Sequence, residues 1–311
     1  MAHENFKIFA APLQGYTEAP WRCAHFSSVG GVDSYFTPFL RVEKGQIRNR
    51  DLRDISPEKN IGVPVVPQAI FSDVDELRLV AQAAIDAGYS RLDLNLGCPF
   101  PPQWKKGRGA GMIPRIDVMA KVSEFIKHTP DLSFSIKMRL GIEDSSEYRA
   151  LMPLINDMPL EYITVHPRVA RQQYSGDLHF DEFAHFCSRS AHPIIFNGDL
   201  QSVEDIDHIR TLFPQIAGVM IGRGLLARPS LAQSWRNRES TLQDADAALL
   251  LLIHDKIYSE YQSTLCGDSQ ILSKIKPYWD YAQSVIERRI WKAIHKSTTL
   301  QRYHQAISPL R

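Results

Sequence analysis

Short apolar segments recur at a regular interval along most of the sequence. There are eight of them, and all but one of the intervals between their starts are about 25 to 35 residues long; most of the stretches between them space their apolar residues as helices do. The segments are residues 8–12, 34–41, 64–71, 91–97, 133–140, 162–167, 193–198 and 218–222. Alternating strands and helices are typical of a parallel α/β sheet, and eight such units predict a TIM (β/α)8 barrel.

Capping residues support the predicted helices. Residues 73–88 begin with acidic side chains, place apolar residues three and four apart, and end in glycine. We expect further helices at 116–128, 145–157, 180–188 and 202–212, and an irregular connection after the second strand segment.

The strand pattern ends after Pro229, and helical spacing continues to the C-terminus. This division predicts a barrel domain at residues 1–230 and a small all-helical domain at 231–311. Residues 274–311 contain eight Lys or Arg against two acidic residues, although the whole chain carries a net charge of only +1. Such a basic segment is typical of a nucleic-acid contact, and a merely solvated helix face is the equally weighted alternative.

The four cysteines, Cys23, Cys98, Cys187 and Cys266, lie far apart without a CxxC pair, so neither a zinc site nor a disulfide framework is indicated. No segment reaches the roughly 18 apolar residues of a membrane span, and the N-terminus lacks the pattern of a signal peptide. We therefore expect a cytoplasmic protein that contacts no membrane, binds no metal and acts as a monomer.

Residues 90–112 combine a strand, a thiol and a basic loop. The alternating leucines of the strand deliver Asn95 and Cys98 to its C-terminal end. The loop that follows carries Lys105, Lys106 and Arg108. This arrangement suggests chemistry on an anionic partner. A lone cysteine is more often a small buried side chain, which is the alternative for Cys98 taken by itself.

Polar residues stand at the C-terminal ends of nearly all the predicted strands, where TIM barrels place their active sites. They are Gln14, Gln68, Asn95, Lys137, Arg139, His166, Arg168, Asn197, Asp199 and Arg223. Any single one could be a satisfied core group, but together they indicate a site. The sequences NGD at 197–199 and GRG at 222–224 are suited to binding a cofactor phosphate. Lys137 and His166 are suited to placing positive charge against a delocalised anion such as a reduced flavin.

At these positions the chain resembles the tRNA-dihydrouridine synthases, flavin-dependent enzymes that reduce uridine in tRNA. The shared motifs, in family order, are APLQGYTEAPWR, DLNLGCP, IKMRLG, VHPR followed by QQYSG, IIFNGDL and GVMIGRGLL, and the helical segment with KIKPYWDY resembles the family's RNA-binding domain. Overall the chain is most similar to the bacterial branch that acts on uridine 16. Leu13, Gln14 and Val169 depart from the family pattern, which bears on substrate placement rather than on the cofactor.

The resemblance implies a catalytic role for Cys98 as the proton donor, because reducing the uracil C5–C6 bond needs a hydride at C6 and a proton at C5. A thiol with a reference pKa of roughly 8.5 is protonated at neutral pH. The resemblance also implies NADPH or NADH as the electron donor, and FMN as the cofactor. The residues implied for FMN are Pro12, Leu13, Gln14, Gln68, Lys137, His166, Asn197, Gly198, Asp199, Gly222 and Arg223.

An enzyme that acts on a base inside tRNA has to extrude the nucleotide, and phosphate contacts should dominate its affinity. The expected substrate-binding residues are Asn95, Arg139, Arg168, Lys105, Lys106, Arg108, Lys274, Lys276, Arg288 and Arg289. Trp104, Tyr278 and Trp279 could stack on bases, although a place in the core is the more common role of such residues.

Two other functions remain open at this stage. One is an FMN barrel that acts on a free pyrimidine, as dihydroorotate dehydrogenases do, which has no need of a basic helical segment. The other is an RNA-binding protein whose reductase activity is lost or secondary, against which Cys98 and the full set of polar strand ends argue.

Overall fold

The structure, a computed structural model, describes residues 6–239 and 243–311, so residues 1–5 of the expected barrel domain and 240–242 of the expected helical domain lie outside the described residues. Within the described part, every predicted apolar segment contains a strand. The strands are β1 (Lys7–Ala10), β2 (Ser34–Phe36), β3 (Leu40–Glu43), β5 (Val65–Val66), β6 (Gln68–Ile70), β7 (Arg91–Leu96), β8 (Ser133–Gly141), β9 (Leu160–Val169), β10 (Ile194–Asn197) and β11 (Gly218–Ile221).

Two of the expected strands are each divided into two. Pro38 lies between β2 and β3, and Pro67 separates β5 from β6, because proline has no N–H to donate to the sheet. β2 pairs with β5 and β3 pairs with β6, both in parallel. The strand order β3-β6-β7-β8-β9-β10-β11-β1-β2 therefore returns to the segment where it began. The sheet is a closed barrel of eight parallel segments, which confirms the predicted fold; β4 (Gln46–Ile47) forms only an antiparallel hairpin with β3.

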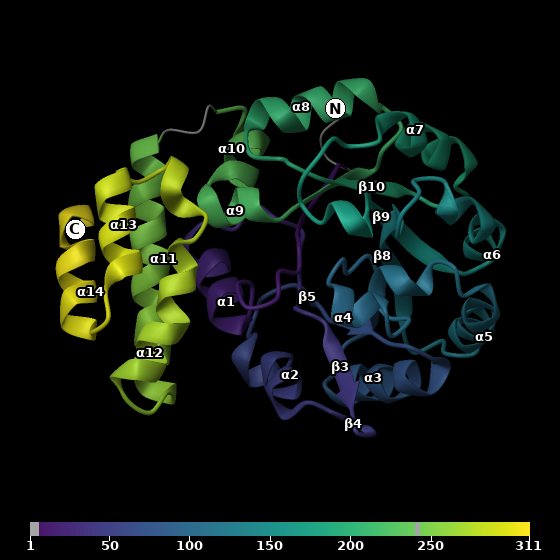
Figure 1. Cartoon of the computed structure of the whole chain (residues 1–311), viewed down its shortest axis with the longest axis horizontal. Helices are drawn as coiled ribbons and strands as arrows, with labels where there is room; N and C mark the ends of the chain where they lie inside the picture. Colours follow the sequence, from purple (N-terminus) through teal and green to yellow (C-terminus); the bar gives the residue numbers. More distant parts are fainter. Residues whose placement is uncertain (1–5, 240–242) are drawn as a thin grey trace.

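Helices surround the barrel in Figure 1. Four of the expected ones are present as α3 (Val74–Asp86), α5 (Ile116–Lys127), α7 (Phe180–Arg189) and α8 (Val203–Leu212), and α1 (Ala19–Ser28) follows β1. The start of α3 is capped by Asp73, whose carboxylate accepts from the N–H groups of Asp75 and Glu76. The irregular second connection contains only α2 (Asn49–Asp54) and the short 3-10 helix η1 (Pro57–Lys59).

The expected helix at 145–157 is broken. It consists of the 3-10 helix η3 (Glu147–Ala150) and the short α6 (Met152–Asn156). Pro153 lies in the first turn of α6, where its missing N–H is tolerated, whereas in a continuous helix the same ring would collide with the preceding turn.

The C-terminal part is helical, as expected, and forms a layer beside the barrel (Figure 1). It contains α11 (Gln243–Thr264), α12 (Asp268–Ile275), α13 (Arg288–Lys296) and α14 (Leu300–Ile307), with the 3-10 helices η5 (Lys276–Trp279), η6 (Ala282–Ser284) and η7 (Ser308–Leu310). α11 packs against α1 of the barrel. The preceding α10 (Leu231–Asn237) packs instead on α8 and on α9 (Arg223–Ala227), and Trp235 Nε1 donates to Asp207 at 2.8 Å.

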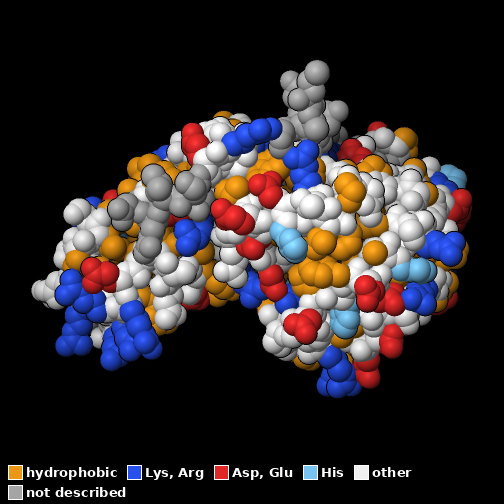
Figure 2. Space-filling view, turned by 90° about the horizontal axis from the view of Figure 1, so that it is seen from above, with side chains coloured by type: hydrophobic (Ala, Val, Ile, Leu, Met, Phe, Trp, Pro, Cys, Tyr) orange, Lys and Arg blue, Asp and Glu red, His pale blue; other side chains and the backbone are white. Residues whose placement is uncertain are grey.

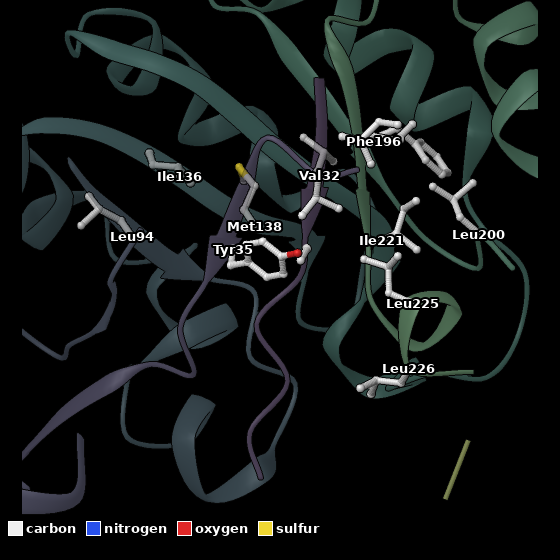
Figure 3. Packing of buried hydrophobic residues seen from close by; sticks show 14 of the residues in the cluster. Val32, Tyr35, Leu94, Ile136, Met138, Phe196, Leu200, Ile221, Leu225 and Leu226 are labelled. Carbon is white, nitrogen blue, oxygen red and sulfur yellow. The ribbon is translucent and has the colours of Figure 1, made fainter. Parts of the chain in front are cut away.

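Alternation along the strands creates two apolar regions. A large cluster fills the space between strands and helices and continues into the helical part; Figure 3 shows a portion of it, with Ile221 of β11 beside Leu225 of α9. The smaller cluster closes the bottom of the barrel interior and consists of Phe9, Ala11, Phe36, Val66, Tyr162, Ile195 and Met220. Polar side chains occupy the interior toward the C-terminal strand ends, which prepares a site there.

Tyr278 and Trp279 belong to the core of the helical part. Trp279 is fully buried and its Nε1 donates to the hydroxyl oxygen of Tyr303 at 2.8 Å. The Tyr278 hydroxyl donates to the backbone carbonyl of Leu250 at 2.8 Å. Neither ring is available to stack on RNA, so the possibility of base stacking at these two positions is wrong.

Among the described residues, no helix is both long enough and apolar enough to cross a membrane.

Candidate active site

A cavity of about 330 Å³ opens at the C-terminal ends of the strands, a volume within the range of roughly 300 to 1,000 Å³ that ligand sites usually have. It brings together residues from distant parts of the chain. Among those lining it are all the residues expected to hold the cofactor: Pro12, Leu13, Gln14, Gln68, Lys137, His166, Asn197, Gly198, Asp199, Gly222 and Arg223. Cys98, Asn95 and Arg139 line the same cavity.

Cys98 is held at the end of β7 by a hydrogen bond from its backbone N–H group to the side chain of Asn95. The side-chain oxygen of Asn95 accepts from the N–H groups of Gly97 at 3.1 Å and Cys98 at 2.9 Å. The loop that follows folds back onto the cysteine, because Gly109 lies so close that an added Cβ would stand 2.6 Å from the Cβ of Cys98. Burial raises the pKa of the Cys98 thiol, so the thiol is protonated at neutral pH.

Below Cys98, the side chains of Asn95 and Gln68 are joined to the fully buried Asp93 by hydrogen bonds. Burial raises the pKa of Asp93 to about 6, against the opposing effects of hydrogen bonds from Ser135 and Gln68. The sequence analysis did not single out Asp93. The period-two pattern of the strand contains the signal, because Asp93 and Asn95 share one face.

A cationic wall faces these residues. The Lys137 Nζ donates to Asn197 Oδ1 at 2.7 Å, and burial together with the nearby Arg139 lowers the pKa of Lys137 to about 8. Burial also lowers the pKa of His166 well below its usual value, with Arg139 and Lys137 contributing, so the ring is neutral. Arg168 can only donate, at 3.2 Å, to His166 Nε2, which places the ring hydrogen on Nδ1.

One end of the cavity is built around Asp199. Its carboxylate accepts from Arg223 at 2.7 Å and forms an ion pair with Arg168. Burial would raise the pKa of Asp199, but the hydrogen bond from Arg168 and the nearby positive charges lower it. The guanidinium groups of Arg223 and Arg139 lie 4.9 and 5.5 Å from the centre of the Tyr174 ring. Three arginines against one carboxylate leave this end suited to an anion.

Arg168 and Arg108 do not line the cavity. Arg168 is buried and also donates to the Gly176 carbonyl at 2.7 Å. Arg108 forms an ion pair with Glu76 and donates to the Val42 carbonyl at 3.1 Å. Both guanidinium groups therefore have internal partners that compete with RNA.

The expected RNA-binding residues of the loop after Cys98 and of the helical part lie outside the cavity. Lys105 and Lys106 are exposed on the loop after α4 (Pro101–Trp104), and the Lys105 Nζ lies 5.8 Å from the centre of the half-buried Trp104 ring. In the helical part, where Figure 2 shows Lys and Arg side chains gathered at one edge, Arg288 and Arg289 are exposed on α13.

Lys274 and Lys276 both have polar partners within the protein. Lys274 lies 3.2 Å from the Glu18 carboxylate, and Lys276 donates to the Ser297 carbonyl at 2.9 Å. Arg289 pairs with Glu287 at 2.8 Å while 79% of its side chain is exposed, so that pair is weak.

The structure adds Phe100, which the sequence analysis missed. Its side chain lines the cavity mouth next to Cys98, yet the residue is 58% exposed. Pro99 and Pro101 flank it, and its carbonyl accepts from the N–H groups of Gln103 and Trp104, so its backbone is fixed. The proline cluster was the available signal of a rigid loop. Across the described ranges, no three His, Cys, Asp or Glu side chains form a group that could hold a metal ion.

A closed β/α barrel with a cavity at its C-terminal end, into which charged and polar side chains converge, defines an α/β-barrel protein with a ligand site in the usual place of that fold. Solved structures agree with the fold: the old yellow enzyme from Trypanosoma cruzi has a TM-score of 0.54 at 11% identity, covering 76% of this chain and 89% of that one. Morphinone reductase gives 0.52 at 12% identity, covering 76% and 86%.

Sequence comparisons are more specific. The family model described as "Dihydrouridine synthase (Dus)" matches residues 9–308. A tRNA-dihydrouridine(16) synthase of Pseudomonas syringae is 30% identical over 73% of this chain and 74% of its own length, and one of Neisseria meningitidis is 28% identical over 79% and 76%. A probable tRNA-dihydrouridine synthase of Helicobacter pylori is 26% identical over 90% and 84%. The chain belongs to the dihydrouridine synthase family, which confirms the expectation from its motifs.

Proposed function

We propose that this protein is a tRNA-dihydrouridine synthase that reduces uridine to 5,6-dihydrouridine in tRNA, with FMN as cofactor and NADPH or NADH as electron donor. The observation that carries the proposal is a protonated cysteine in the same cavity as a cationic wall, in a chain of this family. The names of the relatives support tRNA as the substrate, and several of them name uridine 16.

The residues present fit a flavin mononucleotide. Arg223, with the backbone of residues 197–199 and 222–224, would hold the phosphate, where the excess of arginine over carboxylate favours a dianion. Gln68, Lys137 and His166 would contact the ring, and residues 12–14 would cover one side of it. When bound, a reduced flavin supplies the hydride that C6 of uracil receives.

Cys98 would supply the proton. Its Sγ–H is intact at neutral pH and would protonate C5 of uracil from the face opposite the hydride, after which solvent returns a proton to the thiolate. Lys137, half-buried and 2.7 Å from Asn197, holds positive charge close to the ring position throughout. Closing the cavity with RNA would exclude water from these groups.

RNA would be held outside the cavity. The exposed Lys105 and Lys106 lie on the loop that follows Cys98, and Arg288 and Arg289 present positive charge from the helical part, which we propose as the tRNA-binding domain within residues 231–311. Arg139 and Asn95 line the cavity where the extruded uracil would enter. Arg168, Arg108, Lys274 and Lys276 would act mainly through the internal contacts described above. Because one chain supplies the whole cavity, we propose a monomer, acting on tRNA in the cytoplasm.

The test compares substrates. FMN-loaded protein with NADPH is offered unmodified tRNA and, separately, orotate and free uracil, and dihydrouridine is mapped by position. We expect reduction in tRNA at one position and none of the free bases. Turnover of a free base without any tRNA product, or purified protein that fails to take up FMN, would overturn the proposal.

A further inference from the structure

A continuous chain of hydrogen bonds runs under one wall of the cavity. Gln68 Nε2 donates to Asp93 Oδ2 at 2.7 Å, and Asn95 Nδ2 donates to Gln68 Oε1 at 2.7 Å. Asn95 Oδ1 then accepts from the backbone N–H groups of Gly97 and Cys98. The chain thus connects a buried carboxylate to the backbone of the proposed proton donor.

The two ends of this chain fix its direction. A backbone N–H can only donate, and an ionised carboxylate can only accept. The amides of Gln68 and Asn95 must therefore point the same way along the chain. Each has its oxygen toward Cys98 and its NH2 group toward Asp93. Turning either amide round would set like groups against each other and leave buried polar atoms unpaired, which costs about 1 to 3 kcal/mol for each group.

The fixed direction determines what the cavity offers to a ligand. Both amide oxygens are used inside the chain, and that of Asn95 accepts two N–H groups. Each amide nitrogen has a second hydrogen beyond the one used in the chain. Gln68 and Asn95 both line the cavity, so this wall offers N–H donors and matches carbonyl oxygens of a flat heterocycle.

We propose that Asp93 is a positioning residue: as a buried carboxylate that touches neither cofactor nor substrate, it makes Gln68 and Asn95 present N–H donors to the carbonyl oxygens of the bound rings and holds the backbone of Cys98. The inference rests on the proposed function for the identity of those rings. In this proposal, a residue outside the cavity determines which hydrogen-bond donors Gln68 and Asn95 present to a ligand.

The surroundings of Asp93 support a carboxylate that can also lose its charge. Ser135 Oγ donates to its other oxygen at 2.6 Å, Lys137 and Arg91 lower its pKa, and the neutral Tyr162 lies nearby. Burial outweighs these effects and raises the pKa to about 6. Below that pH the carboxyl gains an O–H that can donate, and the direction of the chain is then enforced only from its other end, by the backbone N–H groups of Gly97 and Cys98.

The first test is Asp93→Asn, which keeps the shape of the side chain but replaces the charged acceptor at one end of the chain by a neutral amide that can also donate, so that Gln68 is oriented only from the Asn95 side. We expect a folded protein whose FMN affinity and dihydrouridine formation each fall by about tenfold or more at pH 7.5, equivalent to about 1.4 kcal/mol. Ser135→Ala is the matched control, since it removes the other hydrogen bond to Asp93 and leaves Gln68 in place. It should change both quantities less than Asp93→Asn does, because the carboxylate that accepts from Gln68 is still present, although the lost Ser135 hydrogen bond no longer lowers its pKa.

Asp93→Asn equal to wild type, or Ser135→Ala as impaired as Asp93→Asn, would overturn the proposal. The FMN titration uses protein stripped of flavin and needs no tRNA. If wild type binds FMN but reduces no tRNA, the proposed function fails while the role of Asp93 is still tested by that affinity.

A second test needs no variant. The phosphate of FMN has its second ionisation near pH 6, and riboflavin lacks this phosphate. The affinity of riboflavin for the wild-type protein therefore reports the contacts of the ring with Gln68 and Asn95 without the titration of the phosphate. Among the groups that face the ring, burial lowers the pKa of His166 well below its usual value and lowers that of Lys137 to about 8. We expect riboflavin to bind more weakly as the pH falls from 7 through 6 to 5. A flat profile, with the protein folded throughout, would overturn the proposal.

Discussion

Replacing Gly109 by alanine tests how the loop behind Cys98 sets the position of the thiol. Gly109 has φ +58, where an added side chain costs roughly 1 to 2 kcal/mol, and its Cβ would lie 2.6 Å from the Cβ of Cys98 and 3.0 Å from the Cys98 N and O atoms. Ordinary contact begins near 3.4 Å, so loop and cysteine must separate by about 0.8 Å.

Gly62 provides a matched control. It has φ +73, but nothing lies within 4 Å of an added Cβ, so Gly62→Ala carries the same backbone strain without the collision. Gly62→Ala should lose roughly 1 to 2 kcal/mol in free energy of unfolding, measured by urea denaturation, and Gly109→Ala should lose more because of the added collision. Only Gly109→Ala should lose turnover, by up to about a hundredfold, because a displacement of about 1 Å at a reacting group has that effect.

The assay is dihydrouridine formed per minute by FMN-saturated protein, with FMN affinity measured alongside. Gly109→Ala should bind FMN normally, since Gly109 does not line the cavity. Turnover by Gly109→Ala within about twofold of Gly62→Ala would refute the reasoning that the loop positions the thiol.

Three further outcomes are expected. Reversing Arg288 and Arg289 to Glu should weaken tRNA binding and flatten its dependence on salt, whereas reversing an arginine of α3 should not; an unchanged salt slope in a filter-binding titration would assign both residues to a solvated face. Phe100→Ala should weaken tRNA binding by about 1 to 3 kcal/mol and leave FMN affinity unchanged, since its exposed ring is placed to stack on a base; equal tRNA binding would exclude that contact. Burial lowers the pKa of His25 and of His254 to about 4. Between about pH 6.5 and 4 the unfolded chain binds protons that the folded chain does not, so stability present above pH 6.5 should fall as the pH falls, and His25→Gln should reduce that slope in urea denaturation.

Periodicity was enough to predict the barrel because every strand segment alternates between the interior and the helices. It did not reveal the divisions of two strands, since Pro38 and Pro67 each interrupt a ladder within what reads as one apolar run. The broken helix near Pro153 has the same origin: a proline is allowed in a first turn, and only the structure shows where a first turn begins.

The cavity residues were predictable because they follow strand ends, which all meet at one rim. The roles of the charged residues around it were less so. Arg108 and Arg168 read as free cations, but their partners Glu76 and Asp199 come from other segments, and sequence spacing does not show such contacts. Asp93 was overlooked because a single acid in a strand looks like an interruption, whereas here it is the end of a hydrogen-bond chain.

The most direct test of the account is the dihydrouridine content of tRNA treated with NADPH and the FMN-loaded variants Cys98→Ala and Cys266→Ala. Cys266 is an exposed thiol of the helical part and serves as the control. The account predicts that Cys98→Ala binds FMN and oxidises NADPH but forms little dihydrouridine, while Cys266→Ala matches wild type. Dihydrouridine formation by Cys98→Ala at the wild-type rate would contradict it.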